Sequence, residues 1–226
     1  MLTGRESKGR SIANRVFASF VFLLVACLGL AAHDGSVLAE DAEITGMVTP
    51  EYDGEGQLKL PTDFRKWVFV GSSLGLSYFG DEKEISEQIF HHIYMQPEAY
   101  DAYVETGKFL EKTMLVMENY TAGSKDDNTA KGVVEGRETF GTMHGQFEDK
   151  RVGLEVALKD SETFEEGWAY FNFSAREGLK PVAKAFPKAA CWNCHNSHGA
   201  DDNVFIQYYP VLRIPFEARL KATKGE

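Results

Sequence analysis

Two thiols and an imidazole stand together in the pentapeptide Cys191-Trp192-Asn193-Cys194-His195. Two cysteines separated by two residues and followed at once by histidine are the attachment pattern of a c-type haem. Each thiol adds across a porphyrin vinyl group to give a thioether, and the adjacent imidazole binds the iron as its proximal ligand. The pattern therefore predicts one covalently attached haem c, with Cys191 and Cys194 as anchors and His195 as the metal ligand.

The same spacing has two other chemical interpretations, a redox disulfide and a zinc site. Zinc needs third and fourth ligands, and because His195 directly follows Cys194, it is awkward for both residues to close one tetrahedron. Haem attachment is the interpretation that the sequence favours.

The N-terminal segment has the composition of an export signal. Basic residues precede an almost continuous apolar run at 16–32, and small residues follow at 37–39. We expect a signal peptide over residues 1–39 whose removal leaves a soluble periplasmic protein, in the compartment where haem c is attached. Two alternatives are open: lipidation at Cys27, which ends a lipoprotein-like stretch, and retention of the apolar run as a membrane anchor.

The expected mature chain is acidic. Residues 1–39 carry four basic and two acidic side chains, so that 20 basic and 32 acidic residues remain, a formal charge of −12. Such a surface repels nucleic acid and anionic lipid, and neither is expected as a partner. Residues 40–59 are acidic and contain glycine, which predicts a flexible leader, and the remaining residues 60–226 suit one domain.

Periodicity and turn residues predict an α+β fold, predominantly antiparallel β-sheet with a few flanking helices. We expect strands at 89–95, 113–120, 139–147, 152–158 and 169–173. Proline and glycine delimit a helix at 97–107, and Thr62 is a plausible cap for a short turn at 64–67. The segment 175–190 predicts a helix leading into the haem motif, started or broken by its prolines. We also expect a loop at 122–128 and an edge strand or extended connection at 205–212.

Several separated motifs, in the same order, resemble the cytochrome P460 family. They are Leu60-Pro61 with Phe64 to Trp67, Tyr94 to Tyr100, Thr106 to Phe109, Gly153-Leu154-Glu155, Lys159-Asp160-Ser161, Trp168-Ala169-Tyr170, the haem motif, and Val204-Phe205 with Tyr209 to Arg213. The resemblance implies a small antiparallel sheet domain with one haem c, periplasmic and usually homodimeric. The same fold includes the β-sheet cytochromes c′, whose five-coordinate haem binds nitric oxide or carbon monoxide.

Three positions depart from the family members that oxidise hydroxylamine. A lysine bonded to the porphyrin edge in those enzymes aligns with Met117, whose thioether has no amine to form that bond. Their distal arginine aligns with His91, and a pocket carboxylate aligns with Phe186. The resemblance therefore does not carry hydroxylamine oxidation over to this chain.

Each remaining candidate has a structural and a functional interpretation. Met117 is either core packing, a contact of the haem edge, or a sixth iron ligand. His91 is either a distal hydrogen-bond donor, an iron ligand, or a half-exposed surface residue, and its neighbour His92 must face the other side of the strand. Phe186 would line the macrocycle, and Arg213 could neutralise a propionate.

Three functions follow from these residues. The favoured one is an exported monohaem cytochrome with an open distal side, which binds a small diatomic or nitrogen-oxide ligand or performs redox chemistry on small nitrogen species. The second is a hydroxylamine-oxidising enzyme. The third is an electron carrier whose sixth ligand is Met117 or His91 and which exchanges electrons with a redox partner protein.

Overall fold

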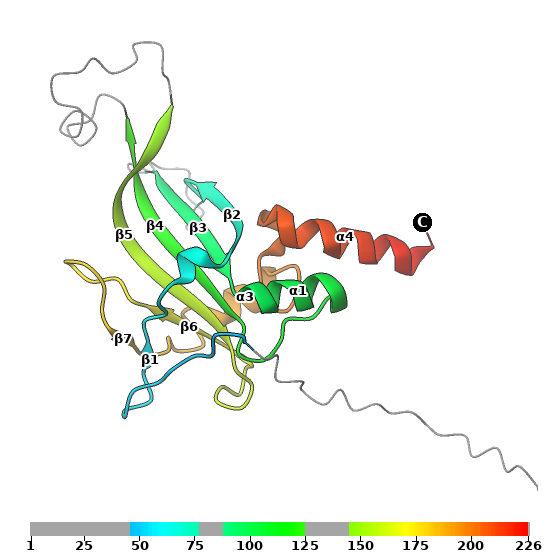
Figure 1. The fold of residues 1–226 in the computed structure, drawn as a ribbon, viewed down its shortest axis with the longest axis horizontal. Helices are drawn as coiled ribbons and strands as arrows, with labels where there is room; N and C mark the ends of the chain where they lie inside the picture. Colours follow the sequence, from blue (N-terminus) through cyan, green and yellow to red (C-terminus); the bar gives the residue numbers. More distant parts are fainter. Residues whose placement is uncertain (1–45, 77–87, 125–144, 226) are drawn as a thin grey trace, which may run out of the picture. The chain divides into compact units, whose positions relative to one another are not determined.

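An antiparallel sheet of five strands forms the centre of the fold, in the order β2-β3-β4-β5-β6. The computed structural model describes residues 46–76, 88–124 and 145–225. Each strand pairs with the next one along the chain, so that the sheet is a meander (Figure 1). The predicted α+β fold, dominated by antiparallel sheet, is confirmed. The strands are Val68–Leu74 (β2), Ile89–Met95 (β3), Met114–Ser124 (β4), Gln146–Lys159 (β5) and Trp168–Asn172 (β6).

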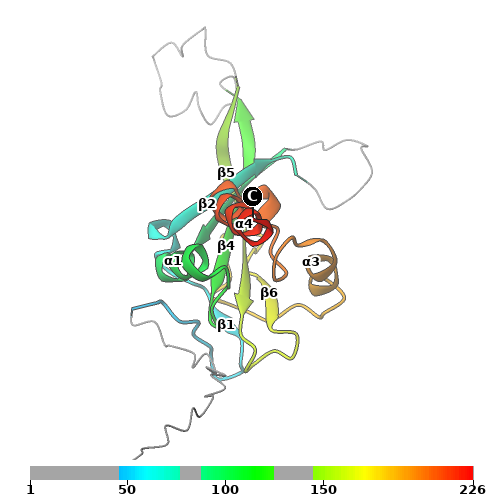
Figure 2. The same cartoon turned by 90° about the vertical axis from the view of Figure 1, so that its right-hand side faces the viewer.

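Short elements cover both faces of this sheet (Figures 1 and 2). The helical face, as we call it, packs against α1 (Pro97–Thr106), α3 (Trp192–His198), η2 (Ile206–Tyr208) and α4 (Pro210–Lys224). The opposite face packs against the 3-10 helix η1 (Phe64–Lys66) and a two-stranded antiparallel sheet of β1 (Leu58–Lys59) and β7 (Val182–Ala183).

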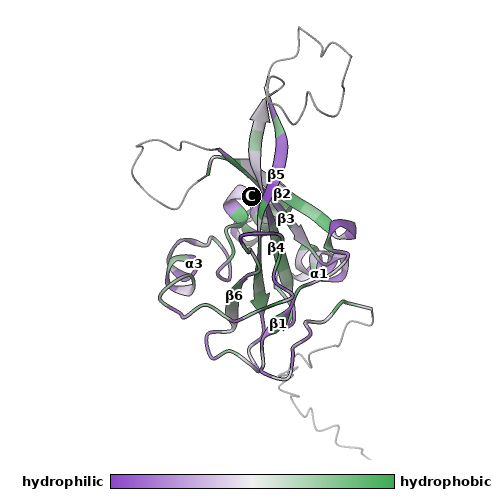
Figure 3. Ribbon diagram, turned by 90° about the vertical axis from the view of Figure 1, so that its left-hand side faces the viewer, coloured by the Kyte–Doolittle hydropathy of each residue, from purple (hydrophilic) through white to green (hydrophobic). Residues whose placement is uncertain are grey.

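Alternation along the strands produces two apolar cores, one on each face. In β4, Met114 and Val116 belong to the core of the opposite face, whereas Leu115 and Met117 belong to that of the helical face. A strand covered on both sides is apolar at successive positions, as residues 114–117 are. Figure 3 shows hydrophobic residues along the strands and a hydrophilic outer end of β5.

Two elements lie where the sequence predicts them. Strand β3 occupies residues 89–95, and α1 has Pro97 in its first turn and ends at Gly107. Gly107 has a φ of 76°, a left-handed conformation that glycine adopts without steric cost. The predicted turn at 64–67 is the single turn η1, although Asp63 rather than Thr62 precedes it, without a side-chain cap.

The long β4–β5 hairpin differs from the prediction. Residues 122–124, expected in a loop, belong to β4. Residues 148–151, expected to separate a strand at 139–147 from one at 152–158, belong to the single strand β5. Residues 125–144 lie outside the described residues. The polar run Asp149-Lys150-Arg151 interrupts the apolar pattern because the outer end of the hairpin projects away from the body of the domain (Figure 1).

Two predictions around the haem motif are wrong. The segment 175–190 is not helical: it contains β7, and the backbone N–H of Phe186 donates to the carbonyl of Tyr170 in β6. Pro181 and Pro187 exclude a continuous helix here because each lacks an N–H donor. The segment 205–212 is not extended, because Pro210 occupies the first turn of α4, where a missing N–H costs nothing.

Part of the expected leader contacts the domain. Leu58 is fully buried in the core of the opposite face. Gln96 Nε2 donates to the carbonyl of Val48 at 3.1 Å, and the Tyr52 hydroxyl donates to Asp160 at 3.1 Å. The described part of this segment, from residue 46, is therefore held in place. Among the described residues, no helix has the length and apolar character needed to cross a membrane.

Candidate cofactor site

Helix α3 carries the haem motif against the edge strand β6. The backbone N–H of His195 donates to the carbonyl of Cys191, so that one helical turn brings the first thiol and the imidazole to the same side. The imidazole lies between two aromatic rings, with centroids 4.2 Å from Tyr170 and 4.5 Å from Phe205. Cys191 and Cys194 are both free, without a disulfide between them.

A backbone carbonyl determines which ring nitrogen of His195 carries the proton. Nδ1 lies 2.9 Å from the carbonyl oxygen of Asn203. Because a carbonyl can only accept, Nδ1 must hold the hydrogen, which leaves the lone pair of Nε2 for a metal. Burial lowers the pKa of His195, and the bond to Asn203 only partly offsets this effect. The neutral imidazole that ligates a metal is therefore the favoured form.

The loop that supplies this carbonyl is anchored on both sides. Asp202 accepts a hydrogen bond from Trp168 Nε1 at 3.1 Å and pairs with Lys159 Nζ at 2.5 Å. Asp201 accepts a hydrogen bond from the Tyr103 hydroxyl at 2.9 Å. Asp202 and Asn203 have φ values of 41° and 62°, a left-handed conformation that costs free energy for residues other than glycine. These contacts hold the strained turn that orients His195.

A cavity of about 300 Å³ opens beside the imidazole. Both thiols and His195 line it together with mainly apolar side chains from β3, β4, β5 and β6. Met117 and Phe186, two of the residues singled out in the sequence, also line it. Phe186 is 42% exposed, so that the cavity reaches the surface at this side chain. An apolar slot with two thiols and a correctly protonated imidazole at its wall fits a haem c.

Two predicted site residues lie outside this cavity lining. His91 is half-buried on the helical face, and its Nδ1 lies 3.1 Å from the hydroxyl of Ser73. Its pKa is lowered, first by burial and then by the neighbouring His92. Arg213 in α4 donates to the carbonyl of Gln207 at 2.8 Å and pairs with Glu217 at 3.7 Å. Neither side chain is among the residues that line the cavity.

The cavity also contains a carboxyl group that sequence reasoning does not single out. Glu155 in β5 is the cross-strand partner of Met117 and accepts a hydrogen bond from Asn172 Nδ2 at 3.3 Å. Burial raises the pKa of Glu155. The alternation of Leu154, Val156 and Leu158 places Glu155 on what looks like a solvent-exposed face, and only the β4–β5 register brings it to the cavity.

Comparison with known families agrees with this geometry. The model of the cytochrome P460 family matches residues 61–206, a range that contains the haem motif and every cavity residue named above. No curated protein sequence matches the chain. Because the match spans more than half of the sequence and includes the site, the chain belongs to the cytochrome P460 family.

Proposed function

We propose that this protein is an exported monohaem c-type cytochrome that binds a small neutral ligand, of the nitric oxide or carbon monoxide type, on an open distal side. Membership of the cytochrome P460 family implies a haem cofactor. One observation carries the finer proposal: both thiols and the imidazole of the motif line a single apolar cavity. We further propose that the protein works in the periplasm as a homodimer. The expected signal peptide lies outside the described residues.

Covalent attachment is the role of Cys191 and Cys194. Each thiol would hold the haem through a thioether to one vinyl group, an addition that needs no oxidant. His195 would hold the iron through Nε2, and the Asn203 carbonyl raises the basicity of this nitrogen by accepting a hydrogen bond from Nδ1. When bound, the haem supplies an iron that coordinates a small ligand and exchanges one electron.

Apolar side chains dominate the remaining wall of the cavity. Ile93 and Met117 are cross-strand neighbours on β3 and β4, and both line it. Such a wall disfavours water and charged ligands, and a neutral diatomic molecule loses little hydration on entry. Met117 provides a thioether and no amine, so that the crosslink of the hydroxylamine-oxidising members has no nucleophile at this position.

One observation favours a second candidate, proton-coupled redox chemistry on a small nitrogen species. Glu155 places a carboxyl group in the same cavity, with a raised pKa. A buried carboxyl group with a raised pKa is a candidate proton donor and acceptor. A purely electron-transferring role requires a sixth protein ligand, and of the two candidates only Met117 lines the cavity.

The test is expression in a host that matures c-type cytochromes, followed by haem staining after denaturing electrophoresis. We expect the wild type to retain its pigment and C191S/C194S and H195Q to lose it or bind it abnormally. H92Q is the control, because His92 is a histidine of β3 that does not line the cavity. A colourless wild type, or covalent pigment in the double cysteine variant, would refute the proposal.

Carbon monoxide then separates the functions. We expect the reduced protein to be high-spin and to bind carbon monoxide rapidly, in the wild type and in M117L alike. A low-spin wild type that becomes high-spin in M117L would instead identify Met117 as an iron ligand and support electron transfer. An E155Q variant that binds carbon monoxide normally but loses turnover of a nitrogen substrate would support the second candidate.

A further inference from the structure

A second hollow, of about 420 Å³, lies next to the haem cavity. It lies where β7 and the residues that follow β6 meet, and its polar lining consists of Gln57, Asn172, Ser174, Lys180 and Lys184. Phe186 lines both this hollow and the cavity. Asn172 also joins the two, because its amide donates to Glu155 inside the cavity. A molecule in the hollow would therefore sit beside the cofactor site.

The charge of this hollow is opposite to that of the chain. Lys180 and Lys184 both line it, no aspartate or glutamate does, and neither lysine forms an ion pair with any described residue. Residues 178–200 contain no acidic side chain, although the formal net charge of the chain is −10. Two lysines at one concavity, without an ion-pair partner among the described residues, produce a local positive potential.

Uncharged hydrogen-bond donors also line the hollow. Ser174 Oγ accepts a hydrogen bond from the backbone N–H of Leu154 at 3.3 Å, so that its own O–H remains to be donated. Asn172 Nδ2 uses one N–H on Glu155 and has a second one. Ammonium groups together with hydroxyl and amide donors are the groups that bind carboxylates and oxyanions.

We propose that the hollow formed by Lys180, Lys184, Asn172 and Ser174 is an anion-binding site for a carboxylate or a small oxyanion. This inference rests on the proposed function, because the site matters through its contact with the haem cavity. Two sources share the required chemistry. One is a propionate of the haem itself, and the other is a free oxyanion such as nitrite.

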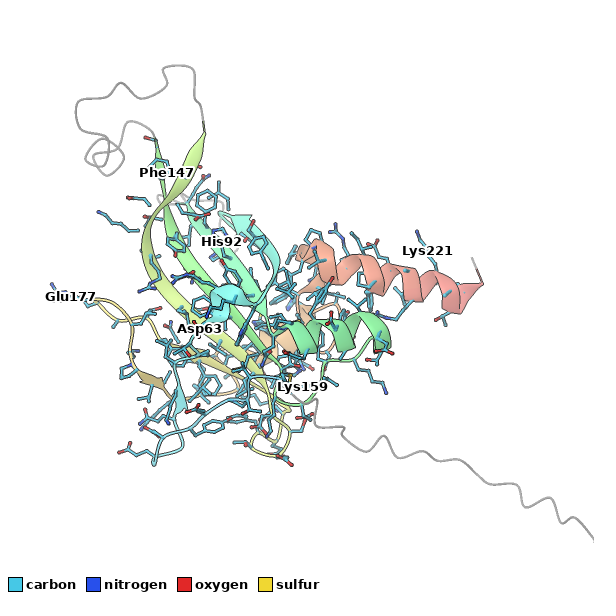
Figure 4. The ribbon with its side chains drawn as sticks, viewed as in Figure 1. Asp63, His92, Phe147, Lys159, Glu177 and Lys221 are labelled. Atoms are coloured by element: carbon cyan, nitrogen blue, oxygen red, sulfur yellow. The ribbon has the colours of Figure 1, made fainter. Side chains whose placement is uncertain are left out.

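The experiment compares K180Q/K184Q with K221Q/K224Q in the haem-loaded protein. The control removes two exposed lysines from the C-terminal end of α4, where Lys221 projects into solvent (Figure 4). Sodium nitrite is titrated into the ferric protein at constant ionic strength set with sodium chloride, and the Soret band is recorded. The reduction potential is measured without nitrite. Carbon monoxide, which is uncharged, should bind equally to all three reduced proteins.

If the hollow binds free oxyanions, K180Q/K184Q weakens nitrite binding at least about tenfold, because it removes two charged hydrogen-bond donors. If it binds a propionate, K180Q/K184Q lowers the reduction potential, because lost positive charge disfavours the reduced iron. In either case K221Q/K224Q resembles the wild type, and the charge-conserving K180R/K184R restores the wild-type value. A coloured K180Q/K184Q protein that matches the control in both measurements would overturn the proposal. A colourless wild type would refute the haem assignment instead.

Discussion

Gly199, the residue after α3, offers a test of how tightly the loop around His195 is built. Its φ of −63° and ψ of 129° are open to any residue. Replacement of glycine by alanine at such a position is ordinarily stabilising, by about 0.4–1 kcal/mol, through the unfolded state. A Cβ at residue 199 would, however, lie 2.7 Å from the carbonyl oxygen of His195, 2.8 Å from the carbonyl carbon of Asn203 and 2.9 Å from the nitrogen of Val204.

All three of these neighbours are backbone atoms, so that no flexible side chain can yield. Insertion of a methyl group into such a space costs about 1–3 kcal/mol. After the gain in the unfolded state is subtracted, we expect Gly199→Ala to lower the free energy of unfolding by about 1–2 kcal/mol. The loop must also move, which weakens the bond from His195 Nδ1 to Asn203. The reduction potential of the haem-loaded variant should therefore rise, because a less basic imidazole disfavours the oxidised iron.

Urea denaturation followed by circular dichroism measures the change in the free energy of unfolding. Gly54→Ala is the matched control, because a Cβ there has no neighbour within 4 Å. We expect that variant to be as stable as the wild type or slightly more stable. If Gly199→Ala were stabilised to the same extent, the packing of this loop against α3 would be looser than described, and the reasoning would be wrong.

Variants at three carboxyl groups and their partners test the charges on and around the sheet. Glu118 is 1% exposed and pairs with Arg65, which is 55% exposed, and with Arg151 at 3.5 Å. Because Arg151 stays beside the buried carboxylate, we expect Arg65→Ala and Glu118→Gln each to cost about 1 kcal/mol in urea unfolding, and R65A/R151A, which removes both partners, to cost about 2–3 kcal/mol. Because burial raises the pKa of Glu155, stability falls as the pH rises from the ordinary carboxyl pKa of the unfolded chain up to the raised pKa of the folded state, and Glu155→Gln should remove this decline in a urea series across pH. Burial raises the pKa of Asp160, but hydrogen bonds, of which the one from Lys112 has the largest effect, outweigh burial, so that the pKa lies below its ordinary value. Asp160→Asn should therefore be less stable than the wild type at neutral pH and match it in acid, and an equal deficit at both pH values would exclude the ionic contribution.

Elements whose ends are marked by residues within the element itself could be predicted from the sequence. The helix α1 has proline in its first turn and glycine after its end, and β3 is a compact apolar and aromatic run. The segment 175–190 could not be predicted, because its backbone bonds are long-range: Phe186 bonds to β6, and Leu60 bonds to Pro181. Alanine and lysine favour a helix only where no distant partner competes.

The site, too, has one part that the sequence predicts and another that it does not. Cys191, Cys194 and His195 are adjacent in the chain, so that their chemistry is visible in the spacing alone. The orientation of His195 depends on Asn203, whose carbonyl carries no sequence signal, and on a turn with positive φ at residues other than glycine. Such strain persists only where surrounding contacts hold it, and those contacts come from β5, β6 and α1.

The three positions that depart from the hydroxylamine-oxidising enzymes do not all line the cavity. Met117 and Phe186 line the cavity, whereas His91 does not. The carboxyl group absent at Phe186 has a counterpart at Glu155, which reaches the same cavity from another strand. A candidate proton donor therefore lies in the cavity, whereas residue 117 carries no amine. M117K would introduce an amine opposite its cross-strand partner Glu155. A red-shifted Soret band in that variant, and its absence in M117K/E155Q, would show that the two strand partners act together.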